Sequence, residues 1–419
     1  MNVLSFSYCF PSSLRPTWGV FVLQRLAALA RQVDLEVASP VPVFPLWSRL
    51  RGGLPSAVEK HGGLTVQYPR WFYIPGILKT LDGRLYARGI RRWFDGQCRR
   101  QRPDLMDAHF VWPDGVGVSH LARQAGLPYV ITLRGWLYPC LERTSLRRQA
   151  RRALLDAAAV ISVSGHLADT AADLGVPRER LHVIPNGVDV DRFRPLDRDR
   201  ARRELGLPTD GALIVAVAHL KRTKGHDELI EAVAALSRDV RLVIVGEDPG
   251  RGAYRHHLEG LIAQRGLTNR ITLAGRQPHD RIPLYLNAAD VSVLASYREG
   301  CPNVVLESLA CGTPVVATRV GAVPDLVTPG QNGTIVPPRD PQPLAEGLSS
   351  VLNRSWSEQP VRDSVRERTW DAVARTILAV FQQVSARGDE TCPSDRRRSG
   401  NPPAVSDAES ALETRSGNP

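Results

Sequence analysis

Residues 298–318 read REGCPNVVLESLACGTPVVAT, the composition expected of a short helix between two buried strands. An apolar run at residues 290–295 precedes the helix, and a second run occupies residues 314–318. Pro302 can open the helix in its first turn and Gly312 can close it, since proline favours helix starts and glycine favours helix ends. A helix that starts directly after a strand presents free backbone N–H groups and a partial positive charge. The stretch therefore predicts a strand–helix–strand unit with an anion site at the helix start.

The same alternation of apolar runs and helical patterns extends over most of the 419 residues. Valine, isoleucine and leucine dominate many runs without alternating polar residues, which is typical of strands buried on both faces of a parallel sheet. Strands that alternate with helices favour βαβ units. We therefore expect an α/β fold with parallel strands at residues 2–7, 34–38, 64–68, 105–110, 129–133, 159–163, 181–184, 212–218, 241–245, 270–274, 290–295, 314–318 and 334–336.

The length favours two domains, at roughly 100–200 residues each. Residues 185–208 interrupt the rhythm with turn-forming residues and then a charged run, which predicts a linker. Two parallel-sheet domains would face each other across a cleft, with ligands at the carboxyl ends of the strands. The predicted parts are an N-terminal Rossmann-like domain, the linker, a C-terminal Rossmann-like domain, a last helix and a disordered tail, at residues 1–190, 191–208, 209–360, 361–385 and 386–419.

The composition is globular, with 43% hydrophobic and 23% charged residues, and the formal net charge of +11 favours anionic partners. The six cysteines form no C-x-x-C pair, which favours the reducing cytoplasm over a disulfide framework or a zinc cluster. Residues 1–10 lack a basic region and a cleavage site, and we expect them to form a strand instead of a signal peptide. No apolar run reaches about 18 residues, so we expect no membrane span.

Two glutamates flank the predicted anion site, Glu299 just before the helix and Glu307 on its second turn. Carboxylates beside an anion site are unfavourable unless they accept hydrogen bonds from hydroxyl groups. A nucleotide sugar supplies such groups, with sugar hydroxyls near Glu299 and the ribose diol near Glu307. The alternative is that both are surface carboxylates, with Glu299 stabilising the helix start.

The stretch resembles the signature of glycosyltransferase family 4, retaining enzymes with the GT-B fold of two Rossmann-like domains. The resemblance implies that Glu299 contacts the donor sugar and Glu307 the ribose. It also implies that residues 1–190 bind the acceptor, that residues 209–360 bind the nucleotide sugar, and that the departing phosphate accepts the acceptor's proton. The backbone N–H groups of Asn303, Val304 and Val305 would hold the diphosphate. The signature is matched by Glu299, Gly300, Pro302, Asn303, Glu307, Ala310, Gly312, Pro314, Val315, Val316 and Ala317.

Residues 217–226, VAHLKRTKGH, match a second family segment, in which a basic residue ends a strand and a Lys-Gly pair opens the next helix. By this resemblance, Lys224 and the residue at the strand end neutralise the leaving diphosphate. Many relatives carry arginine at the strand end, where this chain carries His219, and a neutral imidazole contributes a hydrogen bond without charge. Lys221 and Arg222 could compensate. The alternative for Lys224 is a solvated lysine at a helix start.

Other segments match the family less specifically. Residues 185–189, PNGVD, predict a turn in which Asn-Gly supplies a positive φ, with a structural role beside the hinge. The family places the nucleotide base beside Gly275 and Arg276, and a tight turn without a ligand is the alternative. Gly19 lies in the first strand–helix loop, which touches the diphosphate in relatives.

Two residues at predicted strand ends of the N-terminal half complete the candidate site. His109 is expected to face the cleft and to contact donor or acceptor, and a structural histidine is the alternative. Arg134 stands where many relatives carry histidine. Because arginine cannot act as a base, Arg134 could instead clamp a phosphate or an acidic sugar.

The pattern, including FPSSLRPTWGVFV and WPDG, resembles the branch that builds bacterial envelope and exported polysaccharides, including teichuronic-acid-type enzymes. We therefore expect a lipid-linked or oligosaccharide acceptor. Arginine-rich helices and the aromatic residues 71–78 suggest docking on an anionic membrane, at the inner face of the cell membrane. A solvated helix packed on the core is the alternative. The arginines are Arg84, Arg88, Arg91, Arg92, Arg99, Arg100 and Arg102, with Arg147, Arg148, Arg151 and Arg152.

The sequence DVD at residues 189–191 and the sequence DRD at residues 197–199 imitate a D-x-D metal motif. Because both lie in the linker, we expect loop acids, no bound divalent metal, and no cofactor besides the nucleotide-sugar co-substrate. Two other classes remain open. A nucleic-acid-binding protein would explain the charge, although no binding module is recognisable. A GT-B epimerase or phosphorylase would share the fold, and the phosphorylase would require pyridoxal phosphate.

Overall fold

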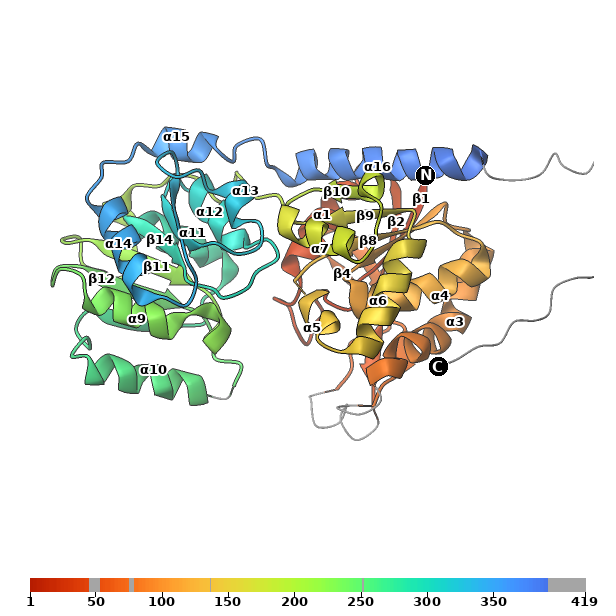
Figure 1. Cartoon of the computed structure of the whole chain (residues 1–419), viewed down its shortest axis with the longest axis horizontal. Helices are drawn as coiled ribbons and strands as arrows, with labels where there is room; N and C mark the ends of the chain where they lie inside the picture. The colour runs from red at the N-terminus through yellow and green to blue at the C-terminus, as the bar shows by residue number, and fades with distance from the viewer. Residues whose placement is uncertain (45–52, 75–78, 136, 251, 391–419) are drawn as a thin grey trace, which may run out of the picture.

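The computed structural model describes residues 1–44, 53–74, 79–135, 137–250 and 252–390, the last four as backbone only. Figure 1 shows two lobes, each with a central sheet between helices. The strands of the two large sheets are parallel except for one antiparallel edge pair. The predicted class, an α/β fold with two Rossmann-like sheets, is therefore confirmed.

The N-terminal sheet has eight strands in the order β10-β9-β8-β7-β1-β2-β5-β4. Their bounds are β1 Asn2–Phe6, β2 Asp34–Ala38, β4 Val58–His61, β5 Leu64–Gln67, β7 Leu105–His109, β8 Tyr129–Leu133, β9 Ala159–Ser162 and β10 Leu181–Val183. Strands β3 (Val41–Val43) and β6 (Arg70–Phe72) form a small sheet of their own. The antiparallel strand β4 was not predicted, since its residues alternate between exposed and half-buried instead of forming an apolar run.

Helices cover both faces of the N-terminal sheet. Apolar side chains of α3 (Asp82–Arg100), α4 (Val116–Ala125), α6 (Thr144–Asp156) and α7 (Gly165–Asp173) pack on one face, and those of α1 (Val20–Leu29) pack on the other. The short helix α5 (Leu137–Leu141) follows β8.

The C-terminal sheet is parallel, with six strands in the order β13-β12-β11-β14-β15-β16. The strands are β11 Leu213–Val217, β12 Arg241–Val245, β13 Ile271–Gly275, β14 Val291–Leu294, β15 Val315–Thr318 and β16 Gly333–Val336. One face carries α8 Arg198–Glu204, α11 Ile282–Ala288, α12 Asn303–Ala310, α13 Val323–Leu326 and α15 Glu358–Asp363. The other face carries α9 His226–Ala234, α10 Ala253–Gln264 and α14 Pro341–Leu352.

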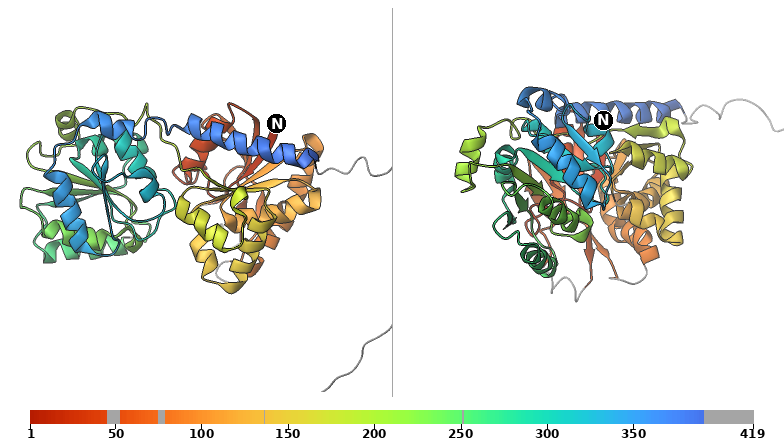
Figure 2. Two further views of the ribbon diagram at one scale, coloured as in Figure 1. Left: turned by 45° about the horizontal axis from the view of Figure 1, so that its top comes forward. Right: turned by 60° about the vertical axis from the view of Figure 1, so that its left-hand side comes forward.

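The chain returns to the first lobe at its end. Helix α16 (Trp370–Glu390) lies along the N-terminal lobe in both views, and its buried Ile377 and Phe381 pack with α1 on the sheet (Figures 1 and 2). The chain thus passes between the lobes twice. A hydrogen bond joins the two connecting segments, in which the Val188 N–H donates to the Arg368 carbonyl at 2.9 Å. Residues 386–390, placed in the predicted tail, continue this helix, and residues 391–419 lie outside the described residues.

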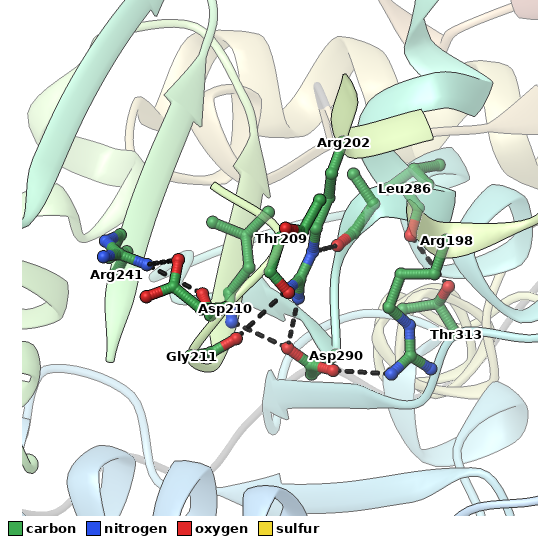
Figure 3. Close-up of polar contacts among 11 residues, drawn as sticks. Arg198, Arg202, Thr209, Asp210, Gly211, Arg241, Leu286, Asp290 and Thr313 are labelled. Atoms are coloured by element: carbon green, nitrogen blue, oxygen red, sulfur yellow. Dashed lines mark hydrogen bonds and ion pairs between the residues drawn. The ribbon is translucent and has the colours of Figure 1, made fainter. Parts of the chain in front are cut away.

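The predicted linker contains α8, which is attached to the C-terminal sheet by a buried arginine (Figure 3). The Arg202 side chain is 3% exposed, and its Nη2 donates to Asp290 Oδ2 at 2.6 Å. Its Nε donates to the Ala288 carbonyl at 2.9 Å. Asp290 Oδ2 also accepts from the Leu213 N–H at 2.7 Å, so one carboxylate joins α8, the start of β11 and the loop before β14.

Candidate active site

A cavity of about 370 Å³ lies at the carboxyl ends of the C-terminal strands. Its wall is formed mainly by the segments that follow β11, β12, β13 and β14, with Thr17 and Phe21 contributed by the N-terminal lobe. The position at strand ends of a parallel sheet is where ligands bind in such folds. The cavity brings together the predicted residues His219, Lys224, Arg276, Glu299, Asn303, Val304 and Glu307.

The cavity wall includes the start of α12. Pro302 directly precedes the helix instead of lying in its first turn. The helix therefore begins one residue later than predicted. Pro302 provides no side-chain cap, and the first backbone N–H groups of a helix have no partners within it. Asn303 and Val304 therefore offer amide donors and a positive helix end to the cavity. Val305 differs from the prediction, because its N–H donates to the Pro302 carbonyl at 3.1 Å and its side chain is buried.

Lys224 and Glu299 form an ion pair in the cavity wall, with 2.5 Å between Nζ and Oε1. The loop that carries Lys224 lies directly against the end of β14. Gly225 has a φ of 69°, and a Cβ there would lie 2.0 Å from the Ala295 carbonyl oxygen, so only glycine permits this approach. The ammonium group offsets the charge of Glu299, which allows an anionic ligand to approach the carboxylate.

His219 and Arg276 both approach Glu247, a residue shortly after β12 that the sequence interpretation did not include in the site. His219 Nδ1 lies 3.8 Å from Oε1 and Arg276 Nη1 lies 3.5 Å from Oε2. Burial, followed by the nearby Lys221, lowers the pKa of His219. The imidazole is therefore neutral at neutral pH and can donate one hydrogen bond without adding charge.

The far end of the cavity holds Glu307 and His279, with 3.7 Å between Oε1 and Nε2. Arg192 Nη1 lies 2.8 Å from His279 Nδ1, and the Phe193 ring packs edge-on against the imidazole. Sequence reasoning missed His279 and Arg192, which are brought together only by folding. Glu307, which was predicted to lie beside the ribose, therefore has hydrogen-bond donors of the protein close to its carboxylate.

A hydrogen-bonded chain crosses from the N-terminal lobe to α12. Arg134 Nη1 donates to Asn186 Oδ1 at 2.9 Å, and Asn186 Nδ2 donates to Asn303 Oδ1 at 2.7 Å. Asn186 belongs to the predicted PNGVD turn. The turn was predicted to have a structural role beside the hinge. Its asparagine also orients Asn303, the first residue of α12.

Several predicted donor-binding residues lie behind the cavity wall. Gly19 starts α1 with a φ of 74°, and a Cβ there would lie 2.1 Å from the Cys9 carbonyl oxygen, so its role is close backbone packing. Gly300 packs against the other lobe, where a Cβ would lie 2.9 Å from the Gly135 nitrogen. Gly275 ends β13, and its carbonyl accepts from the Gly246 N–H at 2.9 Å.

The structure does not place His109 at the cleft. Its side chain is fully buried in the N-terminal lobe, with Nε2 at 3.0 Å from Asp107 Oδ2. Arg25 Nη2 lies 4.0 Å from the other oxygen of Asp107. The strand alternation explains the difference, since residues two apart share a face and His109 follows Asp107 into the interior. The structural alternative for His109 therefore applies.

Because His109 is buried, we expect the free energy of unfolding to decrease at acid pH. Burial lowers its pKa to about 4, although the Asp107 carboxylate acts in the opposite direction. In the unfolded chain this histidine is protonated near pH 6.5. Its contribution to the free energy of unfolding is therefore complete above that pH and is lost as the pH falls toward 4, by up to about 1.4 kcal/mol per pH unit. Urea denaturation between pH 7 and 5 measures the slope.

The matched variants for this test are His109→Gln and, at an exposed histidine, His256→Gln. His109→Gln should have a shallower loss of stability between pH 7 and 5, and His256→Gln should follow the unsubstituted protein. An unchanged slope in His109→Gln would contradict the assignment.

The D-x-D sequences have local roles. Asp189 Oδ1 accepts from the Asp191 and Arg192 N–H groups, and Asp197 caps α8 by accepting from the Arg200 N–H at 2.7 Å. Among the residues that the structure describes, no three His, Cys, Asp or Glu side chains converge on a metal position. Within the same residues, no helix is long and apolar enough to cross a bilayer.

Comparisons with known proteins identify the family and the fold of this chain. Residues 197–369 match the family described as Glycosyl transferases group 1, and residues 69–192 match Glycosyltransferase Family 4. TuaC of Bacillus subtilis (strain 168), named as a teichuronic acid biosynthesis glycosyltransferase, is 31% identical over 380 residues, 88% of this chain and 93% of that protein. A D-inositol 3-phosphate glycosyltransferase of Thermobispora bispora is 28% identical over 404 residues, 89% of this chain and 90% of its own.

Solved structures share the fold. Sucrose-phosphate synthase from Thermosynechococcus elongatus superimposes with a TM-score of 0.77 at 24% identity, covering 92% of this chain and all of that one. Anabaena HepE in complex with UDP and glucose gives 0.67 at 22% identity, covering 93% of this chain and all of that one. The two facing Rossmann-like lobes have the GT-B fold, and the family matches identify a glycosyltransferase. The chain belongs to glycosyltransferase family 4.

Proposed function

We propose that the protein is a retaining hexosyltransferase that moves a sugar from a nucleoside diphosphate donor to a growing polysaccharide or glycolipid of the cell envelope. The observation that carries this proposal is the Lys224–Glu299 ion pair at the uncapped start of α12, in one cavity with Glu307. The cation and the helix end suit a diphosphate, and the two carboxylates suit the hydroxyls of the sugar and the ribose. HepE, whose solved complex contains UDP and glucose, supports this class of donor.

In the proposed reaction, the bond between the anomeric carbon and the donor phosphate breaks while a bond to the acceptor oxygen forms on the same face. The acceptor proton passes to an oxygen of the departing phosphate. Lys224 and the α12 amides stabilise the charge that develops on the diphosphate. Glu299 orients the sugar through its hydroxyls, and His219 contributes a neutral hydrogen bond. No bound metal and no further cofactor takes part in this scheme.

The acceptor would bind in the N-terminal lobe. A cavity of about 180 Å³ there is lined by Tyr8, Phe10, Trp18, Tyr68 and Tyr73. Aromatic faces pack well on the apolar faces of sugar rings, and the tyrosine hydroxyls add polar contacts. The name of TuaC, which refers to teichuronic acid biosynthesis, supports a polysaccharide as the product.

An anionic membrane surface is the proposed location of the acceptor, at the cytoplasmic face of the cell membrane. Tyr86 and Ile90 of α3 are buried on the sheet, so this helix offers charge rather than an apolar face. Residues 75–78 of the predicted aromatic segment lie outside the described residues. The exposed arginines of the α3 and α6 region are Arg84, Arg88, Arg91, Arg92, Arg99, Arg100, Arg102, Arg147, Arg148, Arg151 and Arg152.

Vesicle binding tests this location. The protein should co-sediment with vesicles that contain phosphatidylglycerol and not with phosphatidylcholine vesicles. Since each basic residue near the surface contributes about 1 kcal/mol, reversing Arg84, Arg88 and Arg92 to glutamate should weaken binding by about 100-fold or more. The control reverses three exposed arginines of the C-terminal lobe, Arg200, Arg203 and Arg238. Equal binding by both triple variants would rule out docking through α3.

Ligand-induced stabilisation tests the donor site. Among UDP, GDP and ADP, each with and without a hexose, one base should raise the melting temperature by roughly 5 °C at saturation. Lys224→Ala should remove most of the shift, and Lys60→Ala, at an exposed lysine of β4 outside the cavity wall, should retain it. If no nucleotide shifts the melting temperature, the proposed donor class is wrong.

A further inference from the structure

Arg134, directly after β8, is a buried guanidinium in which two of the three nitrogens have no hydrogen-bond partner among the described residues. Its side chain is 4% exposed. Nη1 donates to Asn186 Oδ1 at 2.9 Å, and the guanidinium carbon lies 4.8 Å from the centre of the Phe21 ring. Within the described ranges, no acceptor lies within hydrogen-bonding distance of Nε or Nη2. These two N–H groups form one edge of the guanidinium, the edge that receives a carboxylate through two parallel hydrogen bonds.

The charge of Arg134 is also without a counter-ion in the described part of the chain. The nearby Asp107 carboxylate is shared by Arg25 at 4.0 Å and His109 at 3.0 Å, and Glu299 is paired with Lys224 at 2.5 Å. Burial lowers the pKa of Arg134 to about 9, so the side chain is still charged at neutral pH. A buried, unpaired cation is costly, and an anionic ligand would relieve that cost.

Arg134 lies directly behind the wall of the donor cavity, next to the segment that carries Glu299. Phe21, which stacks on the guanidinium, is part of the cavity wall. A Cβ on Gly300 would lie 3.6 Å from the Arg134 carbonyl carbon, so Arg134 is next to the segment that carries Glu299. The groups assigned to the diphosphate, Lys224 and the start of α12, belong to the other lobe. Asn186 stands between the Arg134 guanidinium and Asn303 at that helix start, so an anion on the free edge of Arg134 would be a second group besides the diphosphate.

We infer that Arg134 is a specificity-determining residue for a carboxylate-bearing sugar, a uronic acid, in the cleft between the lobes. Its Nε and Nη2 donate to the two carboxylate oxygens, while Asn186 holds Nη1 and Phe21 holds the plane of the group. This inference rests on the proposed glycosyl transfer from a nucleotide sugar. The carboxylate belongs either to the transferred sugar or to the acceptor, and the two sources can be separated by experiment.

Isothermal titration with matched probes distinguishes these sources. The donor arm compares UDP-glucose with UDP-glucuronate, and GDP-mannose with GDP-mannuronate, which differ within each pair only at C6. The acceptor arm compares methyl glucoside with methyl glucuronide, which also differ only at C6, on protein saturated with UDP or GDP. The unsubstituted protein should bind the carboxylate member at least about 10-fold more tightly in one arm, the scale of a bidentate charged contact. A preference in the donor arm assigns the carboxylate to the transferred sugar, and one in the acceptor arm assigns it to the acceptor.

Variants connect the preference to this side chain. Arg134→Gln should reduce the ratio of the two affinities to about 1, Arg134→Lys should keep part of it, and the exposed control Arg178→Gln should keep all of it. For each variant, the affinity for UDP or GDP alone is also measured, and the ratio is compared with it. Equal affinities in both arms for the unsubstituted protein, or a preference that survives in Arg134→Gln, would overturn the inference while leaving donor binding intact. Failure to bind any nucleotide would instead remove the proposed function and this inference with it.

Discussion

Replacing Lys224 or Glu299 with alanine will lower the turnover number by about 100- to 1,000-fold, the usual effect of removing one group that stabilises transition-state charge. Lys224→Ala removes the cation beside the leaving diphosphate and leaves Glu299 as an uncompensated negative charge in the cavity wall. Glu299→Ala removes the acceptor for the sugar hydroxyls. Both side chains are partly exposed, at 24% and 15%, so the fold should tolerate either change.

The measurement is steady-state transfer from the donor identified by the stabilisation screen, with the melting temperature of each variant recorded in parallel. Lys60→Ala and Glu358→Ala are the controls, because both residues are exposed and lie outside the cavity wall. Glu299→Gln adds a finer comparison, since the amide keeps one acceptor oxygen without the charge. Near-normal turnover in Lys224→Ala or Glu299→Ala would contradict the proposed roles.

Replacing Asp290 with alanine will destabilise the C-terminal lobe by about 3 kcal/mol, because it leaves the buried Arg202 guanidinium without its counter-ion. The carboxylate also accepts from Arg198 Nη1 at 2.6 Å and from the Leu213 N–H at 2.7 Å. Figure 3 shows Arg198 and Arg202 of α8 converging on Asp290. The loss should separate α8 from the sheet and lower the urea midpoint of the C-terminal lobe.

Arg198→Ala is the matched control, because Arg198 binds the same carboxylate but is 45% exposed. Exposed ion pairs contribute about 0–1 kcal/mol, so this variant should remain close to the unsubstituted protein. The joint replacement of Arg202 and Asp290 by leucine should recover part of the stability lost in Asp290→Ala, since it leaves no buried charge unpaired. If Asp290→Ala and Arg198→Ala have the same urea midpoint, the buried pair does not stabilise the lobe.

The strands of both large sheets were largely predictable because each is a short apolar run with few internal polar residues, as in YVITL of β8 and VVAT of β15. The exception, β4, alternates in exposure at the sheet edge and pairs antiparallel with β5. Helix α12 was predictable from its flanking strands and from the proline and glycine at its ends. The proximity of Lys224 to Glu299, 75 positions apart, was inferred from family resemblance, since neither side chain carries a local signal for the other.

Tertiary contacts changed the interpretation of other site residues. His109 ends a strand, as predicted, but whether a side chain at a strand end faces the cleft or the core depends on the helices packed above it. His279 meets Glu307 only because the loop after β13 folds across the cavity. The role of Asn186 likewise depends on Asn303, a residue 117 positions away.

By itself, the sequence determined the order of strands and helices, the parallel sheets, and the chemical groups that stand at the strand ends. These features follow from apolar periodicity and turn chemistry, which act over about ten neighbouring residues. Only the tertiary structure decided which charges are compensated. Among the described residues, Lys224 and Arg202 each pair with a carboxylate, whereas Arg134 does not, because pairing in a folded chain depends on distances between segments that are remote in sequence.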